Sequence, residues 1–161
     1  RVYNESLAGK DAQAKLKAIG EAVNKELLPE STALQAEQTA LGPKFQGRTQ
    51  EQIIEDLKKD KALATKYEAY IQRTDKFMAL RQLRSQELQA TTQKTLNDVL
   101  QAAAPDVTAA MAAKNASVVL ERREVVSLAP ASDISTDVIN RFNARVKTIA
   151  VAKVDLTKQQ P

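Results

Sequence analysis

A stretch of 56 residues, from Thr49 to Ala104, contains neither glycine nor proline. It is rich in Ala, Gln, Lys, Glu and Leu, which are strong helix formers. As one α-helix it would be about 84 Å long at a rise of 1.5 Å per residue, whereas a compact domain of this size has a radius of gyration of about 15 Å. Such a helix cannot lie inside the domain, so we predict that it projects from it.

The segment before this helix is its natural antiparallel partner. Two glycines and a proline cluster at residues 42–48, where we place a turn. Thr49 and Gln52 then have the spacing of a capping box at the start of a new helix. Pro29 is expected to kink or break the earlier helix. Residues 1–104 are therefore predicted to form a helical hairpin arm with its tip at the turn.

Apolar residues in both halves of the arm recur at coiled-coil spacing and form a predicted seam. If the chain turns at Phe45, residues whose numbers sum to about 90 should pair, such as Ile19 with Ile71. The first half contributes Leu16, Ile19, Val23, Leu27, Leu34 and Leu41, and the second half contributes Ile53, Leu57, Ala64, Tyr67, Ile71, Thr74 and Met78.

A second stripe lies about 90° around the returning helix from this seam. It consists of Lys66, Tyr70, Arg73, Phe77, Leu80 and Arg84. One interpretation is that the stripe widens the packing face toward the first helix or a neighbouring subunit. The other is that it is an exposed contact site of mixed apolar and cationic character.

The last third of the chain differs in composition, because 12 of its 19 Val and Ile residues lie after residue 104. Pro105 is expected to end the long helix. Val118–Val119–Leu120 and Val125–Val126–Ser127–Leu128 are strand candidates on either side of a turn at residues 121–124. We therefore expect a small β-rich part here.

A further helix is predicted after Pro130, with Asp133 or Ser135 as its cap. Its apolar positions recur every four residues at Ile134, Val138, Phe142 and Val146. The predicted fold is mainly α with a small β body. The long hairpin projects from an oligomerisation body at residues 105–147, and residues 148–161 form either an extra strand or a tail.

Two amino acids with central roles in catalysis are absent. The chain has no Cys and no His, which removes thiolate nucleophiles and the commonest general base and metal ligand. Residues 42–49 superficially match a phosphate loop, but a helix precedes them and Arg48 replaces the required Lys. Glu55, Asp56 and Asp60 lie among lysines and are interpreted as a solvated face. We predict no enzymatic activity, cofactor or metal.

The chain has a net charge of +4 and an isoelectric point of about 9.3. Its basic residues do not form a dense patch with stacking aromatics, so we expect no nucleic-acid partner. The whole charge excess lies in residues 42–96. Lys66, Arg73 and Arg84, with Lys76 and Arg81 beside them, can present one cationic flank that speeds the capture of acidic partners.

Two stretches carry a resemblance to a known family. RVYNESLAGKDAQAKLKAIG at the start, NASVVLERREVVSLAPASDISTDVINRFNARV near the end and the spacing between them resemble the Skp (OmpH-like) family of bacterial periplasmic chaperones. The most telling piece is the helix start at residues 133–139. The resemblance implies a homotrimer with a β-barrel body and helical arms that enclose unfolded outer-membrane proteins without ATP. Family members tend to end near Val146, so the role of residues 147–161 is not implied.

We therefore expect a periplasmic, ATP-independent chaperone that holds unfolded outer-membrane proteins. The alternative is a structural coiled-coil adaptor that binds one folded partner. Contact with an anionic lipid or a membrane surface is left open. The expected client-binding residues are Phe45, Lys66, Tyr70, Arg73, Phe77, Leu80, Arg81 and Arg84.

Overall fold

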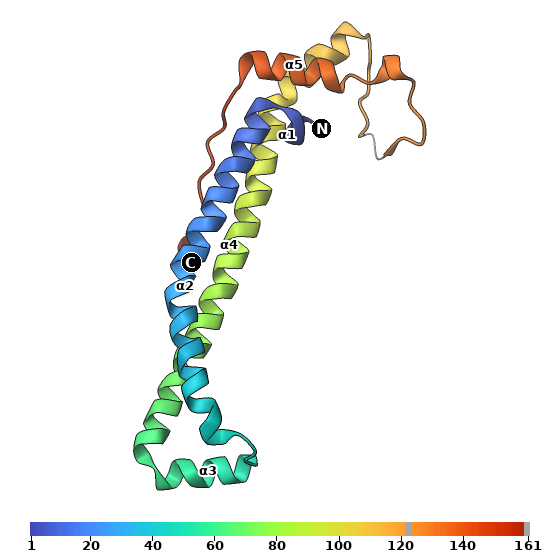
Figure 1. The fold of residues 1–161 in the computed structure, drawn as a ribbon. Helices are drawn as coiled ribbons and strands as arrows, with labels where there is room; N and C mark the ends of the chain where they lie inside the picture. Colours follow the sequence, from blue (N-terminus) through green and yellow to red (C-terminus); the bar gives the residue numbers. More distant parts are fainter. Residues whose placement is uncertain (122–123, 160–161) are drawn as a thin grey trace. The chain divides into compact units, whose positions relative to one another are not determined.

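The computed structural model describes residues 1–121 and 124–159, which are mostly helical (Figure 1). The chain divides into two compact units. The terminal unit combines Arg1–Gly20 with Glu87–Pro161, and the hairpin unit is Glu21–Gln86. The helices are α1 (Val2–Glu5), α2 (Leu7–Phe45), α3 (Gln50–Lys59), α4 (Lys61–Ala113) and α5 (Ser135–Arg145), with short 3-10 helices at Pro130–Ser132 (η2) and Leu156–Gln159 (η3).

The sequence predicts that Pro29 kinks or breaks this segment, and the structure excludes the break, because α2 is continuous from Leu7 to Phe45 with both Pro29 and Pro43 inside it. An internal proline removes one hydrogen bond and costs about 3 kcal/mol. Val23 and Leu34, on either side of Pro29, are both buried, so packing on both sides offsets that cost. The helix ends at Phe45, and the turn that follows contains Gly47 with a φ of 74°, a conformation that glycine adopts readily.

The predicted capping box is confirmed at the start of α3, where Thr49 and Gln52 bond each other's backbone N–H groups. The uninterrupted helix predicted from Thr49 to Ala104 is wrong, because the chain is extended at Asp60. The backbone N–H of Asp60 donates to Asp56 O at the end of α3, and its side chain accepts from the N–H of Leu63 at the start of α4. Asp60 lies in a run of charged residues, and this local sequence does not indicate that one helix ends and another begins there.

Helix α3 lies across the tip of the hairpin unit, between the ends of α2 and α4 (Figure 1). This helix also changes the predicted pairing. The ion pairs of Arg73 with Glu30 and of Arg84 with Glu26 join residues whose numbers sum to 103 and 110, not to about 90. The ten residues of α3 lengthen the turn, so the centre of the hairpin moves along the chain beyond Phe45.

The core of the terminal unit is small and dense. Its fully buried members are Ala8 and Ala12 of α2, Val99 and Ala103 of α4, and Phe142 of α5. The alanines leave room for the helices to approach closely, and the Phe142 ring fills the remaining space. Val2, Tyr3, Ala102, Val146, Ile149 and Val151 pack around this cluster.

Helix α4 continues through Pro105 to Ala113, so the predicted helix end at Pro105 is wrong. Arg145 on α5 donates to Asp106 and to the carbonyl of Ala102, one on each side of the proline. The helix instead ends with Asn115 in the left-handed region, at a φ of 49°. The Ala116 N–H then bonds Met111 O, which closes a Schellman motif.

The predicted β body is not present: within residues 1–121 and 124–159 no strand forms. The strand candidates 118–120 and 125–128 are irregular, and part of the turn predicted between them lies outside the described residues. An isolated two-stranded hairpin is marginally stable at best, because two strands bury too little surface.

The predicted helix near the end is confirmed as α5, with Val138, Ile139 and Phe142 buried. Its start differs in detail, because Ile134 is the N-cap and makes no side-chain cap bond. Asp133 instead accepts from the N–H of Ser135. Residues 148–155 form neither the extra strand nor a free tail, but an extended segment within the terminal unit.

Candidate binding surfaces

Two of the cationic stripe residues in the hairpin unit are engaged by glutamates of α2. Arg73 bonds Glu30 at 3.0 Å through two nitrogens and also bonds Glu37. Arg84 lies 2.7 Å from Glu26. The hydrogen bonds from Arg73 lower the pKa of Glu30, and the same pairing raises the pKa of Arg73. These two arginines therefore serve the pairing of α2 with α4.

The aromatic residues of the hairpin unit also take part in packing. Phe77 is only 9% exposed. The guanidinium of Arg81 lies 5.9 Å from its ring centre, within cation–π range. Phe45 packs edge to face on Tyr67 at 5.3 Å between ring centres. For Phe77, Arg73 and Arg84 the contacts favour the first interpretation of the stripe, in which it widens the packing face.

A groove of about 350 Å³ lies between α2 and α4 in the hairpin unit. Its lining from α4 includes Lys66 and Arg73, two of the residues predicted from the sequence, and α2 contributes Glu37 and Leu41. The groove thus combines both signs of charge with apolar walls. Tyr70 and Leu80 are partly buried on the same helix, whereas Lys66 and Arg81 are exposed.

The exposed apolar residues of the hairpin unit are not the predicted ones. Leu28 of α2, Ile54 of α3, and Ile71 and Met78 of α4 leave between 39 and 63% of their surface exposed. The predicted place of Ile71 and Met78 in the buried seam is wrong, because both side chains are exposed. The predicted seam and the second stripe lie about 90° apart on the helix and both have helical spacing, so spacing alone does not show which of them is buried. The tertiary contacts place Phe77 of the other stripe in the packed face.

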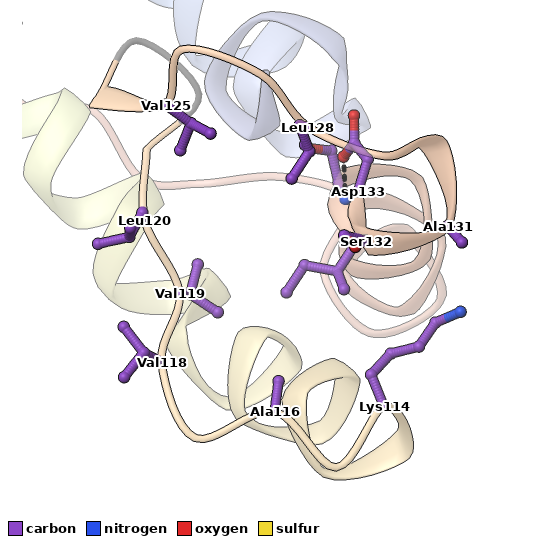
Figure 2. A pocket seen from close by; sticks show the side chains of 12 residues that line it. Lys114, Ala116, Val118, Val119, Leu120, Val125, Leu128, Ala131, Ser132 and Asp133 are labelled. Carbon is purple, nitrogen blue, oxygen red and sulfur yellow. Dashed lines mark hydrogen bonds between the residues drawn. The ribbon is translucent and has the colours of Figure 1, made fainter.

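A second hollow, of about 440 Å³, lies in the terminal unit and is lined largely by an irregular segment, residues 116–121 and 125–134, which includes η2 (Figure 2). All four of Val118, Val119, Leu120 and Val125 line this hollow; in Figure 2 Val119 and Val125 point toward its centre, whereas Val118 and Leu120 lie at its rim on the outer side of the chain. The two outward residues and Val126 are among the most exposed large apolar side chains of the described chain. The candidate strands thus present apolar side chains on both faces.

Other sites weighed from the sequence show no chemistry beyond charge pairing and capping. Arg48 lies 3.3 Å from Asp56, and Lys59 lies 3.7 Å from Glu55, as expected for a solvated charged face. Within the part of the chain that the structure describes, no three His, Cys, Asp or Glu side chains gather as metal ligands. None of the described helices is both long and apolar enough to cross a membrane.

Long paired helices with exposed apolar residues along them define the chain as a helical-hairpin protein with a surface suited to binding. It belongs to the OmpH-like outer membrane protein family, whose model matches residues 1–142. The resemblance noted from the sequence is thereby confirmed.

A crystal structure from Caulobacter crescentus CB15, provisionally described as an outer membrane chaperone (OmpH-like), is similar to this chain. The two have a TM-score of 0.77 and 33% sequence identity, over 99% of this chain and 88% of that one. No curated protein matches the chain.

Proposed function

We propose that the chain is a periplasmic, ATP-independent chaperone that holds unfolded outer-membrane proteins and prevents their aggregation. Membership of the OmpH-like family and the description of the Caulobacter structure support this proposal. The observation that carries it is the set of large apolar side chains left exposed on the paired helices of the hairpin unit. An enzymatic role has no support from the residues described.

The chemistry of this surface suits many clients of differing sequence. Ile71 and Met78 are seven residues apart and lie on one face of α4. Methionine is flexible and polarizable, so it adapts to apolar groups of different shape. Lys66 and Arg81, which are exposed, can attract acidic segments during encounter. Phe45, Tyr70 and Leu80 complete the proposed contact surface where they are partly exposed, while Phe77, Arg73 and Arg84 mainly hold its helices together.

We also propose that the chain works as a homotrimer, assembled through the irregular segment of the terminal unit. Val118 and Leu120 expose apolar surface at the rim of the hollow of Figure 2, and Val126 of the same segment is also exposed. Strand pairing with another copy would supply the backbone partners that the segment needs to become regular. Sedimentation equilibrium should give a trimer, and a folded monomer at every micromolar concentration would contradict this part of the proposal.

The test of the holding function is light scattering after an unfolded outer-membrane β-barrel is diluted from urea. The wild-type chain should suppress aggregation, whereas Ile71→Ser with Met78→Ser should require several-fold more chain for the same effect. The matched control is Gln72→Ser with Gln82→Ser on the same helix, because both glutamines are exposed and polar. Equal performance of the two double variants would contradict the assigned surface. A panel of unrelated clients separates this function from that of an adaptor, which would bind one folded partner only.

A further inference from the structure

Residues 148–158, called the strap below, are held against the helices of the terminal unit at two places. At the first place, the N–H of Ile149 donates to a carboxylate oxygen of Asp11 at 3.1 Å. The Lys15 ammonium donates to the carbonyl of Ile149 at 2.7 Å. The N–H and the carbonyl of Ile149 are thus both hydrogen-bonded by side chains of α2. Figure 1 shows the strap running alongside this helix.

At the second place, the strap meets α4. The N–H of Val154 donates to the hydroxyl oxygen of Thr91 at 2.9 Å, and the N–H of Leu156 donates to Glu87 at 3.4 Å. The other carboxylate oxygen of Glu87 accepts from the ammonium of Lys153 at 2.9 Å. Two side chains one helical turn apart on α4 therefore bind three donors of the strap, two in its extended part and one at the first residue of η3.

These acceptors form a built site and are not chance surface contacts. Glu87 and Thr91 are fully buried, and Thr95 is 2% exposed, in a row of α4 that packing alone would make apolar. The Thr91 hydroxyl also donates to the Glu87 carbonyl at 2.6 Å, so its oxygen is oriented to accept from the strap. If the strap leaves, the hydroxyl and carboxylate meet water, and no uncompensated buried polar group results.

The hydrogen bonds that hold the strap are made mainly with its backbone, while Ile149 and Val151 also pack against the core. Among the bonds described above, only the one from Lys153 uses a strap side chain. Backbone recognition with a few side-chain contacts is the way in which extended peptides are bound with tolerance of sequence. An unfolded polypeptide offers the same unpaired N–H groups.

We infer that this site is a peptide-binding groove, occupied by the chain's own strap, that accepts an extended segment of an unfolded client when the strap is displaced. The segment that fits carries a basic residue immediately before the N–H that reaches Thr91. This inference rests on the proposed function, because unfolded clients supply such segments.

The test uses the full chain with a released strap. Lys153→Glu places a carboxylate against Glu87, and Val154→Pro removes the N–H that bonds Thr91, so together they prevent the strap from occupying its place. The probe is a fluorescent peptide with the sequence of residues 147–158, measured by anisotropy. We expect the released chain to bind it at least ten-fold more tightly than the wild type does. Lys147→Glu is the matched control, because Lys147 is exposed and carries the same charge change.

Two further measurements locate the site and define its ligand. In the released chain, Thr91→Val should weaken probe binding about ten-fold, while Thr92→Val, an exposed neighbour, should not. A peptide of alternating Val and Thr with one Lys at the place of Lys153 should bind within ten-fold of the probe. Binding restricted to the strap's own sequence, or equal binding by wild-type and released chains, would overturn the inference.

The aggregation assay on the same released chain separates the two proposals. If that chain binds both peptides but leaves an unfolded barrel to aggregate, the proposed function fails and the groove stands. If it holds the barrel in solution yet binds neither peptide, the groove is refuted and the holding function stands.

Discussion

Replacing Gly9 by alanine should detach α1 from the terminal unit. A Cβ atom at Gly9 would lie 2.0 Å from the carbonyl oxygen of Tyr3 and 2.7 Å from the carbonyl carbon of the same residue. It would also lie 3.0 Å from the hydroxyl oxygen of Ser6. Gln13 donates to the same Tyr3 carbonyl at 2.9 Å, so this backbone group cannot move without losing a bond. Overpacking of this kind costs about 1–3 kcal/mol of unfolding free energy.

The matched control is Gly20→Ala on the same helix, because nothing lies within 4 Å of the added Cβ there. Alanine in an open helical position stabilises by about 0.5–1 kcal/mol relative to glycine. Both variants make the same chemical change within α2, so this gain is common to them, and their unfolding free energies should differ by the cost of overpacking, roughly 1–3 kcal/mol. Urea denaturation at a fixed chain concentration measures the difference.

Hydrogen exchange of the Gly9→Ala variant should also show faster exchange in α1, since Val2 and Tyr3 are the residues that must leave the core. Equal urea midpoints for the Gly9 and Gly20 variants would refute the reasoning. A Gly9→Ala variant that is destabilised while α1 keeps its protection from hydrogen exchange would also refute it.

Three other changes test packing and charge. Phe142→Ala should cost about 3–5 kcal/mol in urea denaturation, because its ring is fully buried, whereas Leu28→Ala, at an exposed position of α2, should cost much less. Arg73→Glu should lower the melting temperature more than Arg81→Glu, since only Arg73 faces two glutamates of α2; equal effects would contradict the pairing. The pKa of Glu30 is lowered by folding, so its stabilising effect is present at neutral pH and is lost as pH falls through the folded pKa. The melting temperature of the Glu30→Gln variant should therefore fall less between neutral and acid pH than that of the wild type.

Local patterns in the sequence were sufficient where the deciding contacts lie within a few residues. The capping box at Thr49 depends on a side chain three residues away, and the buried face of α5 depends on spacing within eleven residues. Family membership likewise followed from stretches of sequence at the two ends of the chain. The client-binding role of the predicted residues stays a prediction.

Contacts between distant segments decided the rest. The length of the turn at α3 sets the pairing of α2 with α4, and thereby whether Phe77 or Met78 faces the partner helix. Pro29 and Pro105 are tolerated because tertiary packing and the bonds of Arg145 offset their local cost. Glu87 appears in the sequence as one charge among many, and the strap, more than sixty residues away, supplies two donors to its buried carboxylate. Periodicity limits which faces of a helix can be buried, but the choice between two such faces depends on the free energy of burial against a partner, which only the tertiary structure supplies.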